Sequence, residues 1–233
     1  MDREISCPDG PPLVVHRVVR SRRRTVSLVV NEEAALIVRA PLHMPDRDIA
    51  SVVREKSAWI HKHQARMRER LTQRPQRLYE EGEGFLWLGR TLRLTPLAEA
   101  RRVVREDGLL MVPLSGAVER QRLVDHWYRQ EARRILTERV RLWAALMGLT
   151  VDRVTITAAM KRWGSCSGRA NLNFAARLIM APLEVVDYVV VHELAHIPHK
   201  HHGPAFWALV DEQMPDYALH RRWLAEHAHG MVI

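Results

Sequence analysis

Cysteine, lysine and long apolar runs are all scarce in this chain of 233 residues. Cys7 and Cys166 are its only cysteines, too few for a disulfide framework and without the paired spacing of a structural zinc knuckle. No apolar run reaches the roughly 18 residues that a membrane span needs, and charged residues at positions 2–4 leave no hydrophobic signal segment. These absences predict a soluble, cytoplasmic protein with no membrane partner.

Lysine occurs at four positions only, so arginine supplies most of the formal charge of +9 and the pI near 10.3. This balance permits association with nucleic acid or with an acidic partner, and it also suits a chain that charge merely keeps soluble. Composition alone does not place the charge in one patch. The basic cluster at residues 20–24 is expected to be a solvated turn rather than a phosphate site.

Short β-branched runs mark the first third of the chain and predict a small antiparallel sheet. They cover residues 13–20, 25–30 and 34–39. Apolar residues from Ile49 to Ile60 then recur at helical spacing. They predict one helix that starts at Asp46 and ends before Pro75, with Trp59 packed against the sheet. A second group of strands is expected around residues 85–88, 91–94, 102–105 and 109–112.

The longest helical pattern runs from about Val118 to Met147 and ends at Gly148, a typical residue just past a helix. Its apolar stripe is broad enough to pack on two sides. We expect this helix to brace the two halves of the chain. The predicted fold class is α+β, with an N-terminal mixed β domain with one helix over residues 1–114. A C-terminal domain over residues 115–233 includes the bracing helix, a small sheet and the motif described next.

Residues 192–196 read H-E-x-x-H, directly after a mostly apolar stretch. On a helix, His192 and His196 stand at i and i+4, so both imidazoles project from one face and a single metal ion can accept both. Glu193 points to the side of the metal, which suits a base that takes a proton from water. A buried helix face rarely carries two histidines and a glutamate without a task. The motif therefore predicts a metal site rather than a polar surface patch.

Pro198 ends this helix just after His196, because proline has no N–H to donate and disfavours helical geometry at the residue before it. His202 can then turn back to the metal and leave a fourth position open, as a catalytic zinc site requires. The spacing equals that of the metzincin proteases, but His199 stands where they carry glycine. His199 and His201 are alternative third ligands.

Residues 171–178 alternate like a half-buried strand, and a turn at residues 167–169 precedes them. The edge of this hairpin can bind an extended peptide, or the hairpin can be purely structural. Three residues are candidates to stabilise an oxyanion: Arg162, Tyr188 and Tyr217. Three carboxylates are candidates to orient the imidazoles: Asp187, Asp211 and Asp216. We expect substrate contacts from Arg162, Asn173 and Tyr217.

Several motifs together resemble the YgjP-like family of metal-dependent hydrolases. They are R-W-G-S-C-S at 162–167, N-L-N-F at 171–174, Y-V-V-V-H-E-L-A-H at 188–196, His202, F-W at 206–207 and M-P-D-Y at 214–217. S-R-R-R-T-V from Ser21, R-E-K at 54–56 and W-I at 59–60 extend the resemblance over nearly the whole chain. That family looks like a bacterial, cytosolic branch of the zincin metallopeptidases, related to the SprT-like proteases.

The resemblance implies a C-terminal zincin-like metallopeptidase domain that hydrolyses a peptide or protein substrate. It implies one zinc ion per chain on His192, His196 and His202, with Glu193 as catalytic acid and base; in similar chains His201 is often asparagine. Three imidazoles also suit nickel, copper or iron, so zinc rests on ligand type and precedent. Two alternatives are a basic nucleic-acid-associated module with a structural zinc and an interaction scaffold with a vestigial site. The sequence does not predict the oligomeric state.

Overall fold

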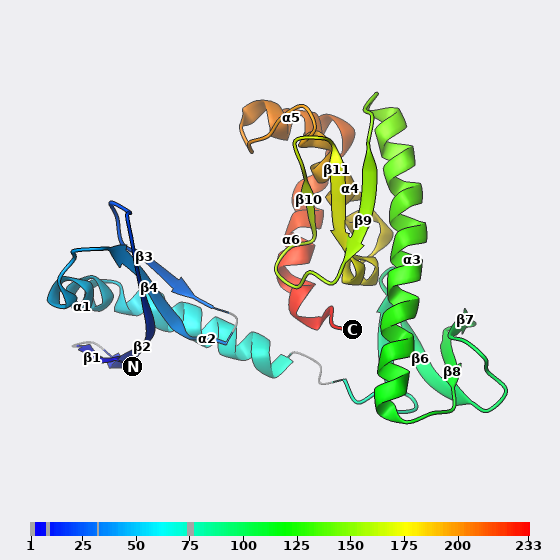
Figure 1. Ribbon diagram of the computed structural model, residues 1–233, viewed down its shortest axis with the longest axis horizontal. Coiled ribbons are helices and arrows are strands. Elements are labelled where there is room, and N and C mark those ends of the chain that lie inside the picture. Colours follow the sequence, from blue (N-terminus) through cyan, green and yellow to red (C-terminus); the bar gives the residue numbers. More distant parts are fainter. Residues whose placement is uncertain (1–2, 8–9, 32, 74–76) are drawn as a thin grey trace. The chain divides into compact units, whose positions relative to one another are not determined.

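The computed structural model describes residues 3–7, 10–31, 33–73 and 77–233. Contacts divide the chain into two compact units, Met1–Pro75 and Gln76–Ile233. Small sheets and helices occur in both units, as Figure 1 shows, so the predicted α+β class is confirmed. None of the described helices is long and apolar enough to span a membrane.

The first unit is built on a sheet of four strands in the order β1-β2-β4-β3. Their bounds are Arg3–Cys7 for β1, Gly10–Ser21 for β2, Ser27–Val30 for β3 and Leu36–Pro41 for β4. β2 and β4 are parallel, whereas β1 pairs with β2 and β3 pairs with β4 in antiparallel fashion. The sheet is therefore mixed, not antiparallel as predicted, because β3 forms its hairpin with β4 and not with β2.

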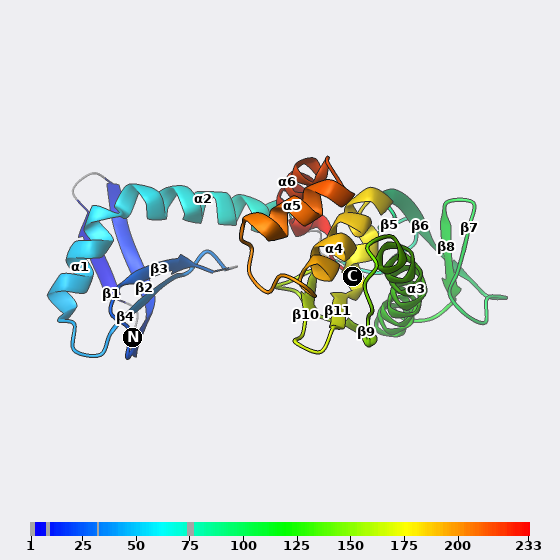
Figure 2. The ribbon, with the colours of Figure 1, turned by 90° about the horizontal axis from the view of Figure 1, so that it is seen from above.

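Two helices, not the single predicted one, cover one face of this sheet (Figure 2). α1 spans Asp46–Glu55 and α2 spans Ser57–Gln73. At Lys56 the backbone leaves helical geometry, with φ −99° and ψ 14°. Ile49 and Val53 of α1 and Ile60 of α2 still enter one core with the sheet, so the apolar pattern continues across the break. A periodicity argument cannot detect such a break.

Trp59 does not pack against the sheet as predicted. Its side chain is 41% exposed, whereas that of Ile60 is fully buried and takes the core position. The indole instead stacks on His63, with ring centroids 4.0 Å apart. Ile60, the next residue of the predicted apolar pattern, therefore makes the core contact in place of Trp59.

The second unit begins with a four-stranded sheet in the order β5-β6-β8-β7. The bounds are Gly84–Trp87 for β5, Arg90–Leu97 for β6, Val104–Glu106 for β7 and Leu109–Pro113 for β8. The long helix α3 (Ala117–Leu146) follows, and Gly148 adopts φ +64° just beyond it. The predicted strands and bracing helix are thus present within a few residues of their expected ends.

The expected boundary at residues 114 and 115 differs from the division after Pro75. The β5–β8 sheet shares one hydrophobic core with α3 and with the elements that follow. The Tyr128 hydroxyl donates to the carbonyl of Leu86, and the backbone N–H groups of Leu88 and Gly89 donate to carbonyls of residues 179 and 180. The second sheet therefore belongs with α3 and the elements that follow it, because its buried face is part of their core.

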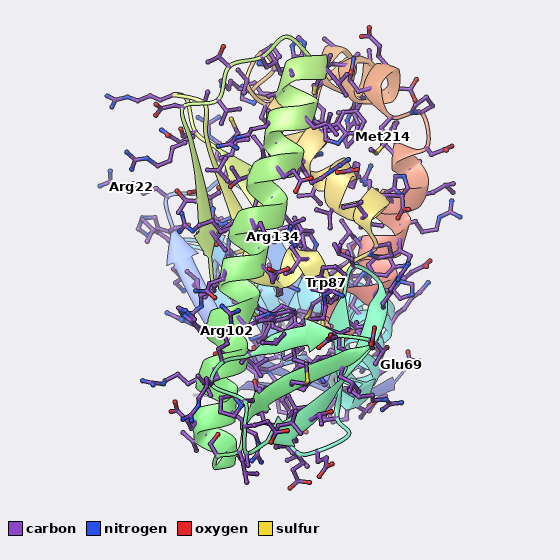
Figure 3. All side chains as sticks on the ribbon, turned by 90° about the vertical axis from the view of Figure 1, so that its right-hand side faces the viewer. Arg22, Glu69, Trp87, Arg102, Arg134 and Met214 are labelled. Carbon is purple, nitrogen blue, oxygen red and sulfur yellow. The ribbon has the colours of Figure 1, made fainter. Side chains whose placement is uncertain are left out.

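The rest of the second unit holds a three-stranded sheet and the metal-motif helix. The strands are β9 (Arg153–Thr157), β10 (Gly164–Cys166) and β11 (Asn171–Ala175), in the order β10-β11-β9. After a 3-10 turn at Ala176–Met180 come α4 (Leu183–Ala195), α5 (Pro204–Gln213) and α6 (Tyr217–His227), with a last 3-10 turn at Ala228–Gly230. Figure 3 shows α3 running the length of this unit, where it packs against β8, β9 and α4.

Candidate metal centre

Three imidazoles converge at the end of α4. His192 lies in its last turn, His196 is its C-cap residue, and His202 lies just before α5. One ligand nitrogen from each of the three lies within 4.8 Å of the others. Among the described residues this is the one cluster of histidine, cysteine and carboxylate groups that could hold a metal ion, and it contains neither His199 nor His201.

A backbone carbonyl fixes the orientation of His196. Its Nδ1 lies 3.0 Å from the carbonyl oxygen of His199. A carbonyl can only accept, so Nδ1 carries the proton and Nε2 keeps its lone pair for a metal. The same role does not fall to Asp187, because the Arg139 guanidinium of α3 donates to both of its carboxylate oxygens at 2.6 Å. Asp187 instead joins α4 to α3, which pack against each other.

Burial favours the neutral form of His192 and His196. Desolvation lowers the pKa of His192 to about 4, with further contributions from His196 and His202. The pKa of His196 is also lowered, first by burial. Imidazole binds a metal in its neutral form, so at pH 7 these side chains need not lose a proton to act as ligands.

Two aromatic residues of α5 form the floor beneath the histidines. The buried Phe206 ring lies 4.6–5.0 Å from all three imidazoles, centroid to centroid. Trp207 stacks on His202 at 5.8 Å and on Tyr217 at 5.3 Å. Nothing in the sequence spacing shows that the Phe206 ring reaches the histidines.

Glu193 is buried, with 5% of its surface exposed. Its Oε2 has no hydrogen-bond partner within the described part of the chain. Desolvation raises the pKa of this carboxyl to about 7, while the charge of Arg162 opposes the rise. A carboxylate whose pKa lies near neutrality is matched to general-base work.

Gly164 on β10 allows Glu193 to lie where it does. A Cβ at position 164 would stand 2.6 Å from both Cγ and Oε1 of Glu193. Real Cβ contacts are almost never shorter than 3.0 Å, so any larger residue would displace the carboxylate. The glycine of R-W-G-S-C-S is therefore part of the site through close approach, a role that the sequence analysis did not assign.

The predicted substrate residues lie in two places. Arg162 and Asn173 line a cavity of about 440 Å³ together with Gly164. Within it, Asn173 donates its side-chain amide to Ser165 across the β10–β11 hairpin, at 3.2 Å. Tyr217 does not line this cavity and lies against Trp207 instead. Tyr188, one turn before His192, has its ring 5.9 Å from that imidazole.

The donor set fits a divalent metal ion. Three convergent imidazole nitrogens form a half-shell of the kind that catalytic zinc sites use, with room for a further ligand. Glu193 lies beside them without joining the cluster, and its free oxygen is unsatisfied by protein. Such an arrangement can activate water next to a base, which is the chemistry of metal-assisted hydrolysis.

Comparison with protein families agrees with this chemistry. Residues 24–227 match the family model described as YgjP-like, metallopeptidase domain. Among solved structures, the zymogen of the metallopeptidase abylysin from Pyrococcus abyssi aligns with 19% sequence identity and a TM-score of 0.37, over 42% of this chain and 99% of that one. No match to the chain was found among curated proteins. Since the family match covers most of the chain, the chain belongs to the YgjP-like metallopeptidase family and is a metal-dependent hydrolase.

Proposed function

We propose that this metal-dependent peptidase uses zinc, held by His192, His196 and His202, and that Glu193 is its general base. The observation that carries the proposal is the pairing of three convergent imidazoles with a buried carboxylate that has a free oxygen. A zinc ion on these residues would act as a Lewis acid that activates water and polarises the peptide carbonyl.

The protein's own groups then have separate tasks. Glu193 takes the proton of the attacking water at its free oxygen and later returns it to the amine that leaves. Its burial supports this role, because desolvation makes the carboxylate a stronger base than one in water. The Nδ1–H of His196, held by the carbonyl of His199, keeps that ring in one orientation throughout.

The substrate is proposed to lie along β10. This strand is at the edge of its sheet, with β11 on one side, and it directly adjoins α4. An extended peptide can add to such an edge through main-chain hydrogen bonds. Arg162 and Asn173, which line the cavity behind β10, would then contact substrate side chains, and the charge of Arg162 would also favour a developing oxyanion. Tyr217 would contact the substrate beyond the histidines.

Glu193→Gln tests the mechanism with little change in shape. We expect the variant to bind zinc as the parent does, since all three imidazoles remain. Its zinc-dependent cleavage of unfolded casein should fall by at least about a hundredfold, the usual effect of losing a general base. Glu184→Gln is the matched control, because Glu184 lies exposed in the first turn of the same helix.

Two outcomes would contradict the proposal. Cleavage that survives in Glu193→Gln would assign the base to another group. A parent protein that binds zinc but cleaves no unfolded substrate would favour a structural site instead.

A further inference from the structure

One face of the sheet in the first unit is basic and is not covered by α1 or α2. Residues alternate between the two faces along each strand, so β2 and β4 present a second set of side chains opposite the buried core. Six residues line a cavity of about 380 Å³ on this side: Arg17, Val19, Ser21, Arg23, Ile37 and Arg39. We call this surface the arginine face.

Within the part of the chain that the structure describes, no carboxylate compensates the charges of the arginine face. None of its lining residues is acidic. Arg17 stands opposite Ile37 and Val19 stands opposite Arg39, so Arg17 and Arg39 are diagonal neighbours on one face of this parallel pair. Neither they nor Arg23 form an ion pair with any residue that the structure describes. Neighbouring positive charges that have no carboxylate partner repel one another and favour the binding of an anion from solution.

Arg20, close by in sequence, shows the contrast. Its guanidinium donates to the carbonyl of Met44 and to the carboxylate of Asp46, both at 2.6 Å, and so holds the segment that leads into α1. This member of the basic cluster is neither a solvated turn residue, as predicted, nor free for a ligand. Arg20 is therefore engaged within the protein, whereas the arginines of the arginine face remain available to bind an anion.

The sequence concentrates positive charge in the same unit. Residues 1–75 contain 15 lysines and arginines and 9 aspartates and glutamates, which is a net charge of +6 out of +9 for the whole chain. The remaining 158 residues carry only +3. A third of the chain thus holds two thirds of the excess positive charge. Charge that only kept the protein soluble would not need to be concentrated in one unit.

A basic groove on the second unit is a weaker anion site. Arg134 of α3 and Arg102, both labelled in Figure 3, line a cavity with two further arginines. Arg134 is already paired with Glu131 at 2.9 Å, and Arg105 lies over the Trp87 ring at 4.0 Å. Two of its four arginines are therefore engaged within the protein.

We propose that the arginine face binds the phosphate backbone of double-stranded nucleic acid, independently of base sequence. Guanidinium groups match phosphate oxygens in geometry and charge. The lining offers arginine, serine and small aliphatic side chains but no aromatic ring, so it lacks the platform on which unpaired bases stack. A duplex carries a higher density of negative charge than a single strand, about one charge per 1.7 Å of its axis, and can present it to several arginines at once. This binding goes beyond the proposed peptidase function and does not depend on it.

The test measures binding of a fluorescein-labelled DNA duplex by fluorescence anisotropy across a salt series. Arg17→Gln combined with Arg39→Gln removes two charges from the arginine face, both at exposed positions. The matched control, Arg54→Gln with Lys62→Gln, removes two exposed charges from α1 and α2 of the same unit. Circular dichroism melts verify that both variants fold.

We expect the face variant to reduce the slope of log affinity against log salt by about 1.8, which at about 0.1 M salt is an affinity loss on the order of fiftyfold. The control should change the slope far less. Equal losses of affinity in the two variants would mean that DNA binding depends on net charge alone, and the assignment of the site to the arginine face would be wrong. The proposal would be overturned if the parent failed to bind the duplex at low salt. It would also be overturned if the parent bound polyglutamate as tightly as the duplex and the face variant weakened both interactions equally.

Discussion

Gly164→Ala moves the carboxylate of Glu193 without altering any imidazole. The new Cβ would lie 2.6 Å from Cγ and Oε1 of Glu193, whereas ordinary contacts begin at 3.4 Å. The carboxylate must therefore shift by about 0.8 Å, the difference between these two distances. Gly164 does not have a positive φ, so its backbone accepts alanine without strain.

The expected effect falls on catalysis rather than on folding. A misplacement of about 1 Å in a reacting group can cost on the order of a hundredfold in rate, and Glu193 is proposed to act at its free oxygen. We therefore expect kcat/KM for an unfolded peptide substrate to fall by about a hundredfold. Zinc content should remain at the parent's level, because the clash is with the flexible end of one side chain and not with a histidine.

Gly168→Ala is the matched control, since a Cβ at position 168 meets nothing within 4 Å in the turn that follows β10. Both variants are assayed with a fluorogenic casein substrate, and their zinc is measured by atomic emission. If Gly164→Ala cleaves as fast as Gly168→Ala, the position of Glu193 does not limit the reaction and our account of the glycine is wrong. If Gly164→Ala loses zinc and Gly168→Ala does not, the claim that the substitution moves Glu193 without disturbing the histidines is wrong.

Three further predictions concern the surroundings of the site. His202→Ala should lower zinc affinity far more than His201→Ala in a chelator competition, because only His202 joins the cluster; the opposite order would transfer the ligand role. Phe206→Leu should weaken zinc binding by about 10- to 100-fold in the same assay with the fold retained, because the ring supports all three imidazoles; unchanged affinity would make it a core residue only. Arg139→Gln should lower the free energy of unfolding in urea by about 3 kcal/mol, because it leaves the buried Asp187 unpaired, and adding Asp187→Asn should restore part of the loss.

Much of the architecture followed from periodicity. The strands β5 to β8, the long helix and the helix of the H-E-x-x-H motif were predicted because long repeats of apolar residues and turn residues such as Gly148 leave few alternatives. The break at Lys56 was missed because the apolar stripe continues through it. The division after Pro75 was missed because sequence patterns locate strands but do not show which helix will bury them.

The candidate site was predictable where the signal is local. The i, i+4 spacing placed two histidines and a glutamate on one helix, and Pro198 indicated where the chain turns towards His202. Phe206 and Gly164 were missed because their roles depend on approaches between elements distant in sequence. Asp187 was a reasonable candidate to orient a histidine, but its guanidinium partner lies 48 residues earlier on α3.

Burial of one short helix segment shifts the pKa values of His192 and Glu193 in opposite directions, and both shifts suit the proposed reaction. Desolvation disfavours any charged form, so it lowers the pKa of His192 to about 4 and raises that of Glu193 to about 7. The first shift leaves an imidazole free to bind a metal at neutral pH, and the second strengthens the carboxylate as a base. Both consequences come from the same apolar run, residues 183–191, that drives α4 into the core. The hydrophobic stretch before H-E-x-x-H is therefore as much a part of the chemistry as the motif itself.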